Sequence, residues 1–182
     1  MARKLVMATR GKQVLKPTVR QLCYLAGVMD SDGCFSISKV SAGTQRTKNP
    51  RYTFCMNVVN TSEVLMKWLV ENFGGRYSHR RKQMRERHKI TYDWWFNNGK
   101  ALWLLKLIEP HLVIKGAQCG NAIQLLEGWK TNQSGAGSKT EETEVARRET
   151  HYLCMKALNQ TGTVQPQRLS PLTPDIQGDA IV

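Results

Sequence analysis

Residues 25–33 have the sequence LAGVMDSDG, in which small and apolar residues precede two carboxylates and a glycine. The apolar residues from Val19 to Met29 recur at helical spacing, and Pro17 suits the first turn of a helix. A glycine is common just beyond the end of a helix. The pattern therefore predicts a helix that begins near Pro17 and ends at Gly33.

The C-terminal half of this predicted helix is apolar nearly all round, because Leu25 and Val28 fill the sides that the main stripe leaves open. Such a helix must be buried on more than one face. Asp30 and Asp32 stand at its C-terminal end, where the helix dipole is negative and each carboxylate costs about 0.3–1 kcal/mol. A neighbouring base or a metal ion would offset this cost, whereas a turn-forming Asp-Gly pair is the purely structural alternative.

Downstream of the helix, the pattern alternates between strands and helices. Residues 34–40 and 51–58 alternate apolar and polar side chains, which indicates half-buried strands. Two further strands are predicted near 76–80 and 90–96, and helices near 62–73, 99–108 and 115–129. The order αββαββα predicts an α+β fold, an antiparallel four-stranded sheet with helices packed on one face.

The opposite face of the sheet is expected to be polar, basic and open. A twisted antiparallel ribbon fits the major groove of B-DNA, where base pairs present distinct donors and acceptors. Seven basic residues and one acidic residue lie between Arg76 and Lys89, which favours DNA over an ordinary solvated face. The predicted nucleic-acid-binding residues are Ser36, Ser38, Arg51, Thr53, Asn57, Arg76, Ser78 and Arg80, with Arg85, Arg87 and Lys89 near a hairpin tip.

The chain has 182 residues and a net charge of +13, which is concentrated before residue 131. A folded core of this charge favours a polyanionic partner, with a solvated basic surface as the alternative. No apolar run approaches the roughly 18 residues of a membrane span, so no membrane partner is expected. The five cysteines lack a C-x-x-C pair, which favours reduced thiols inside a cell, in the cytoplasm of a bacterium or phage host or in an organelle.

The composition divides the chain into three segments. Residues 1–16 are expected to form a basic arm on DNA phosphates, with an organellar presequence as the alternative. Residues 17–130 form the predicted core. Residues 131–182 are expected to hold a linker, a polar helix at about 139–158 that Ser138 and Glu141 start as a capping box, and a disordered tail.

The stretch at 25–33 resembles the signature of the LAGLIDADG homing endonucleases. Four further stretches resemble other parts of that family: Val59-Asn60-Thr61, Phe73 to Arg76, Trp94 to Ala101, and Pro110 to Lys115 with Gln118 beyond. The resemblance covers about residues 18–130 and implies a homing-endonuclease-like fold.

In that family, the signature helices of two units pack together over the scissile phosphates. This chain has one signature, so the resemblance implies a homodimer and a palindromic or nearly palindromic double-stranded DNA target. The expected dimer interface comprises Leu22, Leu25, Ala26, Gly27 and Met29.

The resemblance also implies roles for the site residues. Asp32 is expected to bind Mg²⁺, or another divalent cation such as Mn²⁺, with the carbonyl of Ser31 as a second ligand. Lys115 would stabilise charge on the phosphorane or assist the nucleophile. Asn60 would orient water at a position where the family often has glutamine, and Asp30 would hold nearby backbone amides.

The implied activity is site-specific double-strand cleavage of DNA by divalent-metal-dependent phosphodiester hydrolysis. One alternative is a non-cleaving relative, either an RNA maturase that assists splicing of intron RNA or a DNA-binding regulator. An unrelated alternative is a basic ribosome-associated protein. Asp32 and Lys115 favour cleavage, because a protein that only binds DNA needs neither residue.

Overall fold

The computed structural model describes residues 16–41, 49–79, 89–129 and 141–160. The strands pair antiparallel in the order β1-β2-β4-β3, which confirms the predicted α+β fold. The elements in chain order are α1 (Val19–Ser31), β1 (Gly33–Val40), β2 (Arg51–Asn60), α2 (Glu63–Phe73), β3 (Arg76–His79), β4 (Tyr92–Asn97), the 3₁₀ turn η1 (Asn98–Lys100), α3 (Leu102–Ile108), the 3₁₀ turn η2 (Glu109–His111), α4 (Gly116–Glu127) and α5 (Glu142–Leu158).

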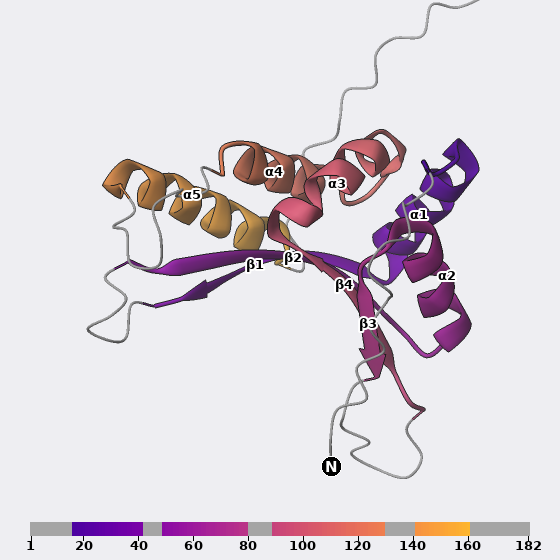
Figure 1. Cartoon of the computed structure of the whole chain (residues 1–182). Coiled ribbons are helices and arrows are strands. Elements are labelled where there is room, and N and C mark those ends of the chain that lie inside the picture. The colour runs from indigo at the N-terminus through magenta and orange to yellow at the C-terminus, as the bar shows by residue number, and fades with distance from the viewer. Residues whose placement is uncertain (1–15, 42–48, 80–88, 130–140, 161–182) are drawn as a thin grey trace, which may run out of the picture.

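The described helices all lie on one side of a bent sheet (Figure 1). Strand β2 shows why, because Tyr52, Phe54, Met56 and Val58 are at most 2% exposed, whereas the residues between them are partly exposed. On β4, Trp94 takes the same side and is fully buried. The predicted alternation of apolar and polar side chains therefore sets which face of the sheet is covered.

Helix α1 begins with a capping box and ends against a glycine. The Thr18 hydroxyl accepts from the Gln21 amide (3.3 Å), and the Gln21 side chain accepts from the Thr18 amide (2.8 Å). At the other end, a Cβ on Gly33 would lie 2.6 Å from the Met29 Cα. Only glycine therefore lets β1 start immediately after the last turn of α1.

Two predicted element boundaries in the second half of the core were wrong. The fourth strand was expected to begin near residue 90, but β4 begins at Tyr92 and Ile90 is an exposed residue before it. The helix expected from residue 99 begins at Leu102, because Asn98 has a φ of 49° and starts the turn η1. The Asn98 side-chain oxygen accepts from the Phe54 amide (2.9 Å), which fixes this turn to β2.

The predicted C-terminal helix exists as α5, but it starts without the predicted capping box. Its N-cap is Glu141, whose side chain makes no capping hydrogen bond, and Ser138 lies outside the described residues. Nor is α5 simply a polar helix on its own, since it packs on α4 and β1 and buries Met155.

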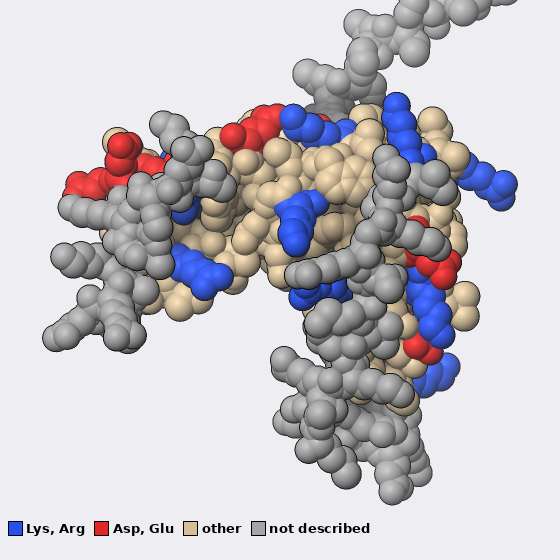
Figure 2. All heavy atoms as spheres, in the orientation of Figure 1, with Lys and Arg blue, Asp and Glu red and all other residues tan. Residues whose placement is uncertain are grey.

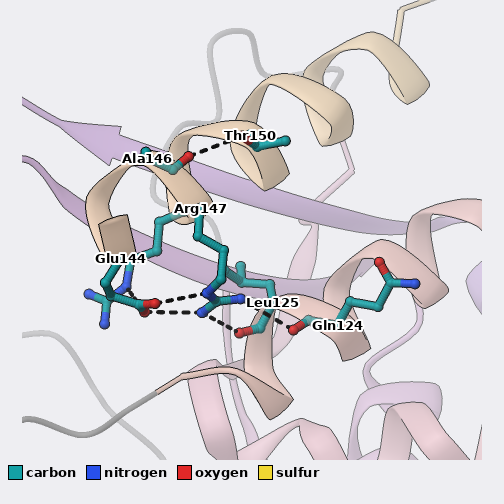
Figure 3. A network of polar contacts seen from close by, with 7 residues as sticks. Gln124, Leu125, Glu144, Ala146, Arg147 and Thr150 are labelled. Atoms are coloured by element: carbon teal, nitrogen blue, oxygen red, sulfur yellow. Dashed lines mark hydrogen bonds and ion pairs between the residues drawn. The ribbon is translucent and has the colours of Figure 1, made fainter. Parts of the chain in front are cut away.

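The Arg147 side chain binds α5 to the end of α4 (Figure 3). The Arg147 guanidinium donates to the carbonyls of Gln124 (3.4 Å) and Leu125 (3.2 Å), and it also pairs with Glu144 (2.8 Å). The last carbonyls of a helix lack partners within it, so Arg147 caps α4 from outside.

No helix in the described segments is both long and apolar enough to cross a lipid bilayer.

Candidate nucleic-acid interface and cleavage centre

The open face of the sheet forms the inner side of the bend and carries polar side chains from all four strands. The strand registers place Cys34, Asn57, Trp95 and Arg76 side by side in one row across the sheet. In the view of Figure 2, Lys and Arg side chains lie along this inner side and also over the outer helices, whereas Asp and Glu side chains are seen only over the outer helices. The shape and charge suit a polyanion.

Eight of the eleven predicted nucleic-acid-binding residues are described, and seven of them lie on this open face. Arg51 and Arg76 are exposed and form no ion pair with any described residue. The others on this face are Ser36, Ser38, Thr53, Asn57 and Ser78. Lys89 is exposed just before β4, and Arg80, Arg85 and Arg87 lie outside the described residues.

The two serines of β1 are already oriented by the sheet itself. The Ser36 hydroxyl donates to the Cys55 carbonyl and the Ser38 hydroxyl to the Thr53 carbonyl, each at 3.3 Å. With their protons committed, these hydroxyls present acceptor lone pairs to the open side.

Three residues of β4 on this face were missed by the sequence analysis: Asp93, Trp95 and Asn97. The Asn57 amide donates to the Asp93 carboxylate (3.1 Å), so neither side chain is a loose surface group. The signal was present, because Tyr92, Trp94 and Phe96 alternate along the strand as large apolar residues, so the residues between them must point the other way.

Two cysteines also belong to this face, Cys34 and Cys55. Burial raises the pKa of the Cys55 thiol to about 11, with Asp93 and Cys34 adding to the effect. Burial also raises the pKa of Cys34, partly opposed by the Lys115 charge. Both thiols are therefore neutral at physiological pH and add no negative charge to the face.

A second group of polar residues lies at the C-terminal end of α1. Asp30 Oδ2 accepts from the amides of Val113 (2.7 Å) and Ile114 (3.2 Å), and its Oδ1 accepts from the amide of Lys115 (2.9 Å). The expectation that Asp30 holds backbone amides is therefore confirmed.

The side chain of Lys115 reaches back over the end of α1. Its ammonium donates to the carbonyls of Met29 (2.8 Å) and Gly33 (2.6 Å). A cation at a helix C-terminus is stabilised by the helix dipole, and this one also offsets the unfavourable position of the two aspartates. The ammonium is thereby fixed at the residue that follows Asp32.

Asp32 is exposed and is held by a single described side chain. The Asn60 amide donates to Asp32 Oδ2 (2.7 Å), and Asn60 Oδ1 accepts from the Ser62 amide at the start of α2 (2.8 Å). No Lys or Arg in the described segments forms an ion pair with Asp32. The structure thus brings Asp32, Asn60 and Lys115 together around the start of β1, with one carboxylate oxygen left open.

These donors fit a divalent cation only in part. A carboxylate of Asp32 and the carbonyl of the exposed Ser31 are hard oxygen ligands of the kind that Mg²⁺ prefers. Within the described ranges, no group of three His, Cys, Asp or Glu side chains is placed to hold a metal ion. Further ligands would have to be water, phosphate oxygens or a second copy of the chain.

Four of the five residues predicted for the dimer interface are buried within their own chain. Leu22, Leu25, Ala26 and Met29 are at most 6% exposed and pack in the core of their own chain, so they cannot also face a second copy. Gly27 is exposed. The residues of α1 that share its exposed side are Arg20, Cys23, Tyr24 and Ser31.

Solved structures of similar fold are DNA-binding nucleases. The homing endonuclease I-CvuI, in complex with a DNA target, matches with a TM-score of 0.61 and 16% identity over 81% of this chain and 86% of that chain. An archaeal intron-encoded homing endonuclease, I-Vdi141I, complexed with DNA, matches with a TM-score of 0.60 and 16% identity over 81% and 89%. At these identities the likeness establishes the fold.

No curated protein matches the chain in sequence. The family model described as LAGLIDADG endonuclease matches residues 25–109, from the first residue of the signature to the end of α3. That match and the shared fold agree with the geometry at the end of α1, and residues 25–109 are accordingly similar to the LAGLIDADG endonuclease family.

Proposed function

We propose that this protein is a divalent-metal-dependent endonuclease that cuts both strands of a specific DNA site as a homodimer. The observation that carries the proposal is the open carboxylate of Asp32, held by Asn60 and adjacent to the fixed ammonium of Lys115. This group lies where α1 meets the basic inner face of the sheet. A protein that only bound DNA would not need an open carboxylate beside a fixed ammonium.

Each of these residues has a role that its contacts allow. Asp32 and the Ser31 carbonyl would hold a divalent cation, which when bound supplies charge stabilisation at the scissile phosphate and activates water. Lys115 holds a proton and a positive charge beside the same phosphate. Asn60 keeps Asp32 in position, which is a different task from the water-orienting role expected from the sequence.

The surface that α1 leaves exposed supports a homodimer. A Cβ on Gly27 would meet nothing within 4 Å, so the chain's own packing gives no reason for glycine there. Tyr24 on α1 is 54% exposed, and Val113 and Ile114, bonded to Asp30 near the end of α1, are 90% and 58% exposed. A second copy on this surface would bury the apolar side chains, and its two-fold symmetry would require a palindromic or pseudo-palindromic site.

The relatives support DNA as the partner and a divalent metal as the cofactor. I-CvuI was determined with the I-CreI target in the presence of magnesium and with its own target in the presence of calcium, and I-SmaMI was determined on an uncleaved DNA target with calcium. In this chain, the Asp32 carboxylate suits a divalent cation, and the exposed arginines of the open face suit DNA.

The decisive experiment is a cleavage assay with the purified protein, with and without Mg²⁺. Its substrate is the continuous DNA sequence formed by joining the sequences on the two sides of the gene. Asp32→Asn should abolish double-strand cleavage and retain binding, because it removes a metal-binding charge from an exposed side chain. Mixtures of wild type and Asp32→Asn should accumulate nicked DNA, since each copy serves one strand. Glu71→Gln, an exposed carboxylate on α2, is the matched control and should cleave normally.

Unchanged cleavage by Asp32→Asn would remove that residue from the active site. Specific binding without cleavage by the wild type would instead support the non-cleaving alternative. Intron RNA is then the next ligand to assay, since a maturase would bind it and promote splicing.

A further inference from the structure

The distal end of the β1–β2 hairpin is bound to α5 by a cluster that joins two residues of the matched family region to one residue outside it. Lys39 and Tyr52 face each other directly across the two strands. The Lys39 ammonium pairs with Glu149 of α5 (2.7 Å), and the Tyr52 hydroxyl donates to the same carboxylate. Glu149 therefore joins both strands to a helix that the family model does not include.

The cluster is well enclosed for a surface ion pair. The Lys39 and Glu149 side chains are only 31% and 30% exposed, and the Lys39 ammonium lies 5.9 Å from the ring centres of both Tyr52 and Tyr152. Hydrogen bonds from Lys39 and Tyr52 lower the pKa of Glu149, so it is ionised at physiological pH. Helix α5 is itself fixed, because the Asn159 amide donates to the Phe35 carbonyl of β1 (2.8 Å) and Arg147 holds α4.

Lys39 lies on the side of the sheet that the helices cover, so it does not face the DNA side. It follows Phe35 and Ile37 at the two-residue period of the covered face. Its neighbours Ser38 and Arg51 point to the open face, so the cluster lies directly behind residues that would contact bases. What Glu149 fixes is the position of those residues.

The length of β1 indicates how far from the centre of the site these contacted bases lie. Strand β1 runs from Gly33, next to Asp32, to Val40, and at about 3.3 Å per residue this spans about 23 Å. With one base pair per about 3.4 Å, the distal end of the hairpin reaches about seven base pairs from the centre of a symmetric site.

We propose that Glu149 is a positioning residue for specificity: by clamping Lys39 and Tyr52 to α5, it sets how the distal hairpin reads the outer base pairs of each half-site. This inference rests on the proposed function, because it needs a sequence-specific DNA partner. It assigns a purpose to α5, which a cleavage centre at the other end of β1 does not require.

The test is selection of bound duplexes from a randomised DNA library, followed by sequencing, with wild type and Glu149→Gln. The variant should lose about 3- to 10-fold of its discrimination at positions about six to eight base pairs from the centre, part of the usual cost of a mismatch, and keep its preferences near the centre. Glu142→Gln makes the same charge change at an exposed position of the same helix and should match wild type. Tyr52→Phe, which removes one hydroxyl from the cluster, should reproduce the outer loss in part.

A readout of cleavage separates positioning from general damage. On the wild-type consensus at saturating protein, Glu149→Gln should cut at the wild-type rate while its dissociation constant rises. The charge-reversed pair Lys39→Glu with Glu149→Lys should restore outer discrimination. A loss of base discrimination that is uniform along the site, or a loss of equal size in Glu142→Gln, would overturn the inference. A wild type that enriches no symmetric sequence would overturn the proposed function itself.

Discussion

Asp30 connects the end of α1 to a segment more than eighty residues further along the chain. Its two oxygens accept from three consecutive backbone amides, those of residues 113–115. Lys115 closes the contact from the other side by donating to the Met29 and Gly33 carbonyls. The signature helix and the lysine that follows Pro110 are therefore one local unit, joined by five hydrogen bonds.

Replacing Asp30 by Asn should weaken this unit. An amide side chain presents a single oxygen, and its NH₂ group would face a backbone N–H donor. We expect the free energy of unfolding to fall by about 1–3 kcal/mol, the usual cost of leaving such donors unsatisfied, together with slower DNA cleavage. Urea unfolding measures the first effect. Asp32→Asn, on an exposed carboxylate with one partner, should change stability by less than about 0.5 kcal/mol, and equal losses in the two variants would contradict the assigned difference.

At this scale, the family resemblance predicted the role of Asp30, and local helix chemistry predicted that of Gly33. Asp30 was expected to hold amides and does so, and Gly33 was expected to end the helix. The hydrogen bond between Asn60 and Asp32 was not predictable, because it depends on where the last residue of β2 meets the end of α1. No local pattern specifies that meeting.

Helix α5 illustrates how polar contacts can integrate an element that has little apolar surface of its own. The Asn121 amide donates to the His151 carbonyl (3.0 Å), and the His151 ring nitrogen Nδ1 contacts the Asn121 oxygen (2.7 Å). Burial, followed by the Arg147 charge, lowers the pKa of His151. The folded protein therefore favours the neutral ring.

Acidification should loosen α5 in a way that depends on His151. Unfolded chains bind a proton near the ordinary histidine pKa of about 6.5, whereas the folded chain resists it, so stability is lost as the pH falls through that value. Thermal unfolding from about pH 7.5 to about pH 5.5 should show a smaller loss for His151→Gln than for wild type. The lowered pKa of Glu144 and of Glu149 acts in a more acidic range. Parallel curves for the two proteins would contradict this account.

The elements show where sequence patterns are sufficient and where they are not. Alternation in β2 predicted the covered face residue by residue. The apolar pattern of α1 did not say which side its own core takes, because nearly every side is apolar, and the interface was consequently placed on Leu25 and Ala26. For α5 the composition indicated a polar helix, but its packing depends on Glu149 and Arg147 finding partners that are distant in sequence.

Across the whole molecule, the positive charge is divided between the two sides of the sheet. Lys39 and Lys106 are paired with Glu149 and Glu127, whereas Arg51 and Arg76 on the open face have no described ion-pair partner. The charge available to DNA is therefore smaller and more localised than the net charge suggests.

DNA affinity should fall steeply with salt, by about 10³- to 10⁵-fold between 50 and 200 mM if 6–10 phosphates are contacted. Arg76→Gln should lower the affinity and, if the side chain binds a phosphate, reduce the slope of log affinity against log salt by about 0.9. Lys106→Gln removes the same charge from the helix side and should leave the slope unchanged. Fluorescence anisotropy over a salt series measures both, and a salt-insensitive complex would argue against binding by this face.

The hydrogen bonds between Asp30 and residues 113–115 have a consequence for the geometry of any dimer of this chain. If one copy swivels against the other, the spacing between their two Asp32 carboxylates changes, while the distance from each carboxylate to its own Lys115 does not. Adjustment to DNA of different groove width would thus alter only the separation between the two Asp32 carboxylates. Each half of the catalytic centre would move as one rigid group.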